Sequence, residues 1–182
     1  MAVLHTAIIG LGQHFPGFSE ANGHGASVGA LMLSVAMVGS IFFKMMVGAI
    51  SDRLNAVTAN LLMITISLVS VALFISKPGP TLLLVAAFFF GAAYSIPAVG
   101  LPLLTKELLG KHYFNKVFPI ISFGLATSGA VSISLIGYLF DFSGSYTLAL
   151  LLAIGINVAN IFLLVVMMAM TKKTVNRQTL SL

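Results

Sequence analysis

A lysine interrupts one of the long apolar runs of this sequence, and the presence of a charged side chain there requires an explanation. Lys44 lies inside residues 26–50, eight positions before Asp52, which is about 12 Å along a helix. An ionisable side chain inside a membrane span is by default a functional-site candidate, here a cationic ligand for an anionic solute. The alternative is a lysine whose long stem lets the ammonium reach the lipid headgroups.

Three further polar residues are candidates for lining a solute path. Gln13 and His14 end the first apolar run, where they could form an outer mouth or relay protons, since histidine titrates near neutral pH. The alternative is an interfacial pair in water. Tyr94 lies mid-run, three residues before Pro97, and kinked helices build substrate sites in transporters. The alternative there is a packing kink, with the tyrosine hydrogen-bonded to a neighbouring helix.

Gly48, Asp52 and Arg53 end the run that holds Lys44. Small residues such as Gly48 let helices approach closely. An aspartate beside a helix terminus can pair with an arginine, or accept backbone hydrogen bonds from the start of the next helix. We therefore expect a clasp at this end of the bundle that holds two helices together in one conformation and releases them in another.

The sequence has none of the patterns typical of an enzyme. It contains no H-E-x-x-H, no G-x-S-x-G, no P-loop and no paired carboxylates within an apolar run. Its four acidic residues all lie near the ends of apolar runs, which leaves little for acid–base catalysis. We expect a non-enzyme with no catalytic residue, no metal site and no cofactor.

The composition favours a bilayer as the solvent of these residues. Hydrophobic residues make up 59% of the chain and charged residues 7%, against roughly 25% charged in soluble domains. The mean hydropathy is +1.09. The net charge of +5 does not indicate nucleic acid, because the basic residues are dispersed between apolar segments and do not form a patch.

Six apolar segments predict an all-α, polytopic membrane protein, a six-helix bundle over residues 1–170 followed by a basic tail, 171–182. The segments cover about 1–15, 26–50, 57–76, 80–104, 117–139 and 146–170. Five of them reach the roughly 20 residues that a span needs. The first is either a short interfacial piece or a span whose beginning is missing.

Two of these segments carry small or polar residues in helical register. The segment 117–139 has a stripe that predicts a close-packing surface or a moving interface, made of Gly124, Ser128, Gly129 and Ser132. Asn157 and Asn160 are three residues apart and share one helix face. We interpret them as interhelical hydrogen-bonding groups.

The distribution of lysine and arginine predicts the orientation. The connections 51–56 and 106–116 and the tail hold seven of these residues, whereas 16–25, 76–80 and 141–146 hold only Lys77. Short basic loops stay on the cytoplasmic side. We expect a multi-pass protein of the cell (plasma) membrane with its C-terminus in the cytoplasm.

Residues 48–53, GAISDR, resemble the G-x-x-x-D-R core of the loop motif of the major facilitator superfamily. Residues 137–146 resemble the outer turn between the last two spans of that family, and 88–97 its tenth span. The resemblance covers nearly all of the chain. It implies one half of a major facilitator fold, spans seven to twelve with the seventh truncated, closest to the bacterial oxalate/formate antiporter and monocarboxylate-transporter-like branch.

The resemblance implies secondary transport of a small solute by alternating access, with a coupled proton or counter-anion. Oxalate-exchanging members use a basic residue in the eleventh span, and residues 117–139 have none, so a monocarboxylate or similar organic anion is expected. The implied lining is the first segment with 26–50, 80–104 and 117–139, whereas 57–76 and 146–170 face lipid. The expected partners are the bilayer and a missing N-terminal six-span half. The alternative is an inactive or accessory six-span module that does not transport alone.

Overall fold

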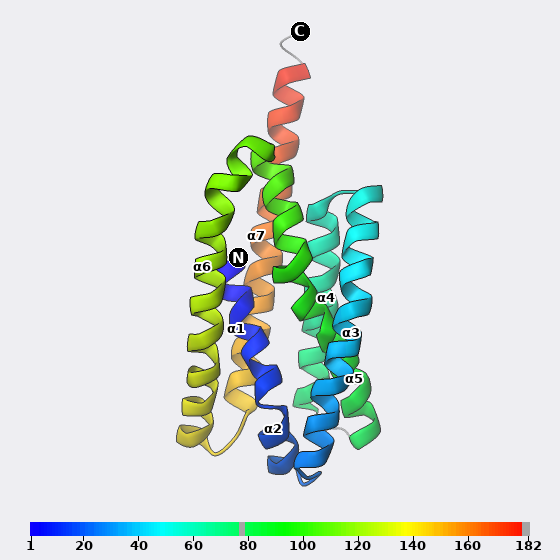
Figure 1. The fold of residues 1–182 in the computed structure, drawn as a ribbon, viewed down its shortest axis with the longest axis vertical. Coiled ribbons are helices and arrows are strands. Elements are labelled where there is room, and N and C mark those ends of the chain that lie inside the picture. Colours follow the sequence, from blue (N-terminus) through cyan, green and yellow to red (C-terminus); the bar gives the residue numbers. More distant parts are fainter. Residues whose placement is uncertain (77–78, 180–182) are drawn as a thin grey trace.

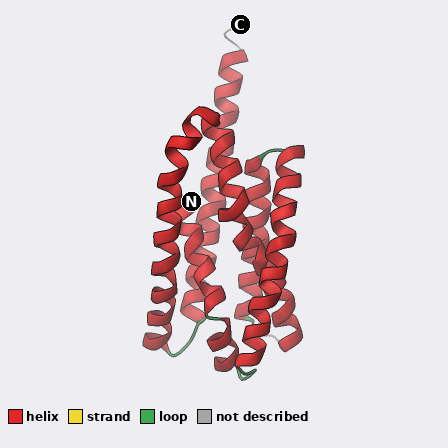
Figure 2. Ribbon diagram, viewed as in Figure 1, coloured by secondary structure: helices red, strands yellow, loops and turns green. Residues whose placement is uncertain are grey.

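The computed structural model describes residues 1–76 and 79–179, with side chains described through residue 169, and this part of the chain is helical without strands (Figure 2). The helices are α1 (Ala2–Gln13), α2 (Phe15–Ala21), α3 (Ala26–Arg53), α4 (Ala56–Ile75), α5 (Pro80–Ser95), the π-helix η1 (Ile96–Gly100), α6 (Leu101–Ser143) and α7 (Thr147–Thr179). The predicted all-α class is confirmed.

Four helical stretches are long and apolar enough to cross a membrane: Ala26–Arg53, Ala56–Ile75, Pro80–Ser143 and Thr147–Ala169. The third is 64 residues long because α5, η1 and α6 follow one another without a loop. Gly110 breaks α6 with φ 73° and ψ 165°, and Figure 1 shows the chain turning back there. We call residues 80–109 the first leg and 111–143 the second leg. With α1, α3, α4 and α7, the two legs give the six rods expected from the sequence.

Three boundaries differ from the prediction. Residues 16–25 were expected to form a loop, but α2 occupies part of them because Pro16 stands in the first helical turn and Phe18 is buried. The connection 106–116 is helical on both sides of Gly110. The tail predicted from residue 171 begins as a continuation of α7.

The predicted small-residue stripe is confirmed as a packing surface, and its partner is α1. A Cβ on Gly10 would lie 2.5 Å from the Ser132 hydroxyl, and one on Gly124 would lie 3.2 Å from Val3. The Ser128 hydroxyl donates to the Val3 carbonyl. Small residues therefore bring α1 and the second leg into close contact along most of the length of α1.

A second close approach joins α3 to α5. A Cβ on Gly39 would overlap the Phe88 carbonyl oxygen, and one on Gly91 would lie 2.5 Å from the backbone of Gly39 and Ser40. Only glycine fits at these two positions without moving the helices apart.

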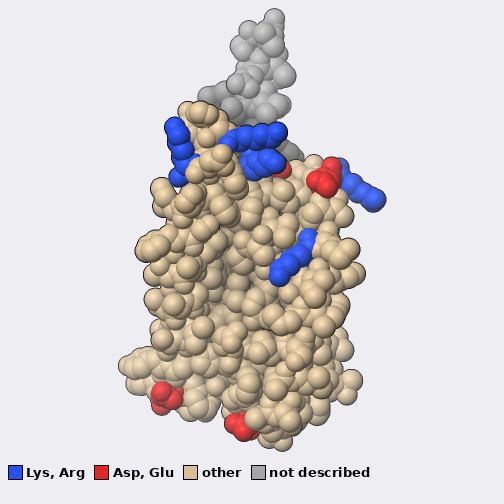
Figure 3. Space-filling view, in the orientation of Figure 1, with Lys and Arg blue, Asp and Glu red and all other residues tan. Residues whose placement is uncertain are grey.

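The charged side chains gather at the two ends of the bundle, as Figure 3 shows. We call one the basic end: α3 and the first leg finish there, and it holds Arg53, Lys106, Lys111 and Lys116 with Asp52 and Glu107. The opposite acidic end holds Glu20 and Asp141, with no described lysine or arginine. Lys77 and the side chains of Lys172, Lys173 and Arg177 lie outside the described residues.

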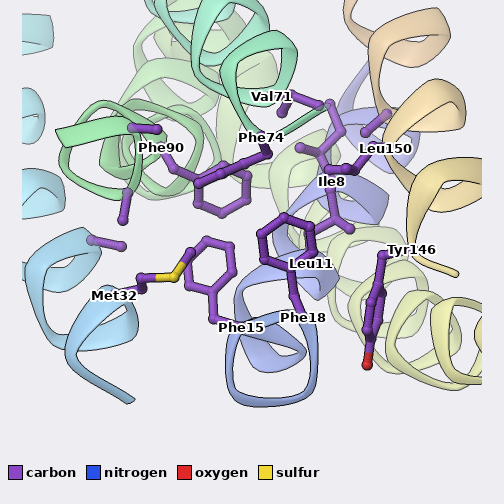
Figure 4. Packing of buried hydrophobic residues seen from close by; sticks show 14 of the residues in the cluster. Ile8, Leu11, Phe15, Phe18, Met32, Val71, Phe74, Phe90, Tyr146 and Leu150 are labelled. Atoms are coloured by element: carbon purple, nitrogen blue, oxygen red, sulfur yellow. The ribbon is translucent and has the colours of Figure 1, made fainter. Parts of the chain in front are cut away.

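The core consists of two apolar clusters, one towards each end. The acidic-end cluster includes rings and aliphatic side chains from α1 to α7, among them Phe15, Phe18, Phe74, Phe90 and Tyr146 (Figure 4). Phe15 makes edge contacts with Phe74 and Phe90 at centroid distances of 5.4 and 5.2 Å. The basic-end cluster centres on α3, α4 and the first leg, and Leu164 of α7 completes it.

Candidate functional site: the open face of α1, α3 and α6

The helices differ in what they expose to their surroundings. Figure 1 places α1, α3 and α6 nearest the viewer with α7 behind them, and we call the near side the open face. Every exposed side chain of α7 between residues 148 and 169 is apolar. The second leg instead exposes Thr127, Ser134 and Tyr138, which share one helix face opposite the stripe packed on α1. The exposed surface of the second leg therefore carries a few hydroxyl groups among apolar side chains such as Phe123 and Val131. The exposed surface of α7 has no hydroxyl group between residues 148 and 169.

Among the charged residues in the part of the chain that the structure describes, Lys44 lies farthest from the ends of its helix or leg. It lies eighteen residues after the start of α3, which is about 27 Å along an axis of about 42 Å. Its side chain is partly buried, and it has no ion pair or hydrogen bond to any described residue. Figure 3 shows isolated basic atoms on the flank of the bundle, surrounded by uncharged residues. The ammonium is thus available to a group from outside the chain.

Tyr94 points from α5 onto α1. Its hydroxyl lies 3.5 Å from the Ile9 carbonyl oxygen, and the ring fits because residue 12 is glycine, where a Cβ would overlap the hydroxyl. The long hydrogen bond fits the alternative in which this tyrosine joins two helices across a kink.

The predicted kink is present and takes the form of η1, the π-helix containing Pro97. Proline has no backbone N–H, so the Ala93 carbonyl loses its usual partner four residues on. His5 of α1 supplies a replacement, with Nε2 at 3.1 Å from that oxygen. The kink is therefore secured from a neighbouring helix, by a histidine for which the sequence alone gave no partner.

Asn60 of α4 secures the other end of the kink. Its amide nitrogen donates to the Gly100 carbonyl at 2.9 Å and to the Ala56 carbonyl at 2.8 Å. Asn60 lies against Gly100 so closely that a Cβ there would overlap the amide. We did not single out Asn60 from the sequence; the available signal was a lone asparagine in an otherwise apolar run.

Gln13 and His14 lie at the acidic end. His14 Nε2 donates to the Ile133 carbonyl of the second leg at 2.9 Å, and its ring is 5.9 Å from that of Tyr146. Gln13 is exposed. Tyr94 contacts the same turn of α1 through Gly12, but Lys44 lies towards the basic end, so the predicted binding residues do not form one pocket.

At the basic end, a different residue makes the contact expected of Asp52. Asp52 is exposed and has no ion pair with Arg53 or other bond within the described part of the chain. Glu107 of the first leg instead accepts a hydrogen bond from the Ala56 amide at 2.6 Å. The first leg therefore places the carboxylate at the positive end of the α4 dipole.

Gly48 also differs from the expectation, because no atom lies within 4 Å of the position its Cβ would occupy. It is not a close-packing point in this arrangement. The residues of the predicted clasp thus have no partner within the described part of the chain, and the contact between α4 and the first leg at this end depends on Glu107. Asn55 caps α4 itself, because its side chain accepts a hydrogen bond from the Thr58 amide at 2.7 Å.

A hollow of about 290 Å³ lies beside the Gly110 break, lined by Lys106, Lys111, Phe114 and Asn115. Two ammonium groups there favour anions arriving at the basic end.

No family model, no curated protein and no solved structure matches this chain.

Proposed function

We propose that this chain is one half of a secondary transporter of the major facilitator type, which moves a small organic anion across a membrane by alternating access. The observation that carries the proposal is the partly buried, unpaired Lys44 inside a helix long enough to span a bilayer. The hydroxyl groups exposed among the apolar side chains of the second leg support it.

The energetics of Lys44 favour an anionic counterpart. A lysine near the centre of a membrane helix costs about 2.5–3.5 kcal/mol on insertion scales. Its Cα lies about 6 Å from the middle of α3, so the stem must reach some 9 Å to leave a hydrocarbon layer of about 30 Å. A carboxylate that binds the ammonium offsets this cost, whereas a neutral solute does not.

The hydroxyl groups exposed on the second leg favour a cover other than lipid. The hydroxyl groups of Ser134 and Tyr138 would face hydrocarbon if nothing else packed there, although such groups prefer a protein or aqueous surface. The Thr127 hydroxyl already donates to the Phe123 carbonyl. A second six-helix bundle with a water-filled path between the halves meets this need. In the proposal, the basic end faces the cytoplasm of a bacterial cell.

The kinked first leg supplies the moving part. A π-helix held by His5 on one side and Asn60 on the other can change its bend by exchanging side-chain for backbone hydrogen bonds. The Glu107 contact with α4 ties the basic end of this leg, so a change in bend is passed to that end.

Uptake into proteoliposomes tests the proposal. The chain would be reconstituted alone and together with a second six-span half, and uptake of radiolabelled lactate and oxalate measured. We expect lactate uptake only with both halves. Lys44→Gln should reduce lactate uptake about tenfold, equivalent to about 1.4 kcal/mol. Lys116→Gln is the matched control and should retain most uptake, because that residue lies at the basic end.

Two results would overturn the proposal. One is uptake by the chain alone, and the other is an equal loss in the Lys44 and Lys116 variants. Absence of uptake with every partner and solute would favour the accessory-module alternative.

A further inference from the structure

The two apolar clusters are separated by a layer of polar side chains. Buried polar side chains lie between the clusters on three helices: His5 on α1, Ser67 on α4, and Asn157 with Asn160 on α7. All four are fully buried. The helix that carries both asparagines, α7, packs against both α1 and α4, so all four side chains lie on α7 or on a helix in contact with it. We call these four residues the polar layer.

Most polar atoms of this layer have no partner within the described part of the chain. They are His5 Nδ1, Ser67 Oγ, Asn157 Oδ1 and both amide atoms of Asn160. Each unpaired buried group costs about 1–3 kcal/mol, and buried polar groups in proteins are rarely left unpaired. Such a concentration on α7 and on two helices that pack against it indicates a site for a small polar guest.

His5 is the base of this layer. Its Nε2 donates to the Ala93 carbonyl at 3.1 Å, since a carbonyl can only accept, so Nε2 carries the hydrogen of the neutral ring. Nδ1 is then a lone-pair acceptor turned towards the interior. The carbonyl that fixes this tautomer is the one freed by Pro97.

We propose that His5 is a proton-binding site inside the bundle, where Nδ1 takes up a proton whose charge is stabilised by the oxygens of Ser67, Asn157 and Asn160. The proton comes from water and no other bond changes. An asparagine amide suits both states, because rotation presents its N–H to the neutral ring or its oxygen to the protonated ring.

Few other charges face this site. On α1 the Met1 amino group is the nearest, one turn before His5, and α5 contributes the Tyr94 hydroxyl. On α3, Lys44 lies closer to the basic end. The described parts of α4, α6 and α7 place no titratable side chain at this level. The layer therefore holds one base among neutral oxygens, without a carboxylate that would fix the proton permanently.

The role of the proton rests on the proposed transport function. A charged imidazole in a dry interior is costly, so loading favours a state in which the layer opens to water, and unloading favours the closed state. Because His5 also donates a hydrogen bond to the Ala93 carbonyl, a change in the protonation of the ring affects the π-helix of the first leg. This makes a proton the coupling ion.

Nitrogen NMR on the whole chain in lipid nanodiscs, with ¹⁵N-labelled histidine, tests proton binding without a transport assay. Signals absent from a His5→Gln sample identify His5 among the four histidines. The pH is lowered from about 8 to about 3.5, well past the usual histidine pKa of about 6.5, because a fully buried ring is costly to charge. Over this range we expect both ring nitrogens of His5 to reach imidazolium shifts.

Variants of the layer make the test specific. Asn157→Leu with Asn160→Leu should prevent the imidazolium signal over the same range. Ser40→Ala is the matched control and should leave it intact, because the buried Ser40 hydroxyl already donates to the Met37 carbonyl. A wild-type His5 signal that stays neutral to about pH 3.5, or one unaffected by the asparagine replacements, would overturn the proton site. Neither result depends on uptake, and a failure of lactate uptake would leave the titration standing.

Discussion

The contact between Gly39 and Gly91 gives the sharpest stability prediction. A Cβ at residue 91 would lie 2.5 Å from backbone atoms of α3, whereas ordinary contact begins at 3.4 Å. The Gly91→Ala variant must therefore separate α3 from α5 by about 0.9 Å or bend one of them. Neither helix backbone can move aside as a flexible side chain could.

Overpacking of this kind costs about 1–3 kcal/mol. For a chain of this size each kcal/mol corresponds to about 2–4 °C, so we expect the midpoint of thermal unfolding to fall by roughly 2–12 °C. The chain has no tryptophan, and fluorescence-detected gel filtration of a fluorescent-protein fusion after heating provides the measurement.

Gly48→Ala is the matched control. It makes the same chemical change in a long apolar helix, but nothing lies within 4 Å of the new methyl group. Alanine is the better helix former by about 1 kcal/mol, so this variant should be as stable as the parent or slightly more so. Equal stability of the Gly91→Ala variant and the parent, or an equal fall in both variants, would refute the reasoning.

Three further predictions concern the helix ends. Glu107→Gln should destabilise the bundle by about 1 kcal/mol, because a neutral amide binds the start of α4 less well than a carboxylate, whereas Asp52→Asn should leave the heating midpoint unchanged. Gly110→Ala should cost about 1–3 kcal/mol in the same assay, since φ 73° with ψ 165° suits only glycine, and Gly79→Ala, at φ −60°, should cost little. Burial, followed by two nearby carboxylates, raises the pKa of Tyr146 in the turn before α7. The fold therefore loses stability as pH rises above the unfolded value of about 10, and Tyr146→Phe should reduce that loss in a pH series of melting midpoints.

The long helices could be predicted because each corresponds to a long apolar run and because the runs are separated by residues that typically end helices. Pro80, Gly110 and the turn at 51–56 separate runs whose lengths match membrane helices. The small residues on 117–139 also predicted a packing surface correctly. The identity of the helix packed there could not be predicted, because any neighbour with a small or flat face satisfies the same pattern.

The site was less predictable, since its contacts join residues far apart in the chain. The sequence directed attention to Asp52 because an acid and a base stand together there, but the carboxylate that reaches the start of α4 comes from Glu107, 51 residues from its partner. His5 meets Ala93 across 88 residues. The kink predicted beside Pro97 followed from local chemistry, and only the fold revealed the histidine that binds the carbonyl freed there.

The chain reverses its direction at Gly110 without an intervening loop, so the two legs are joined directly. The first leg is tied to α4 through Glu107 and Asn60, whereas the second leg packs mainly on α1. An axial displacement of one leg must therefore pull on the other, as two rods joined by a single pin do. Inserting a few flexible residues at this pin would uncouple the halves of the bundle mechanically without altering any contact in its core.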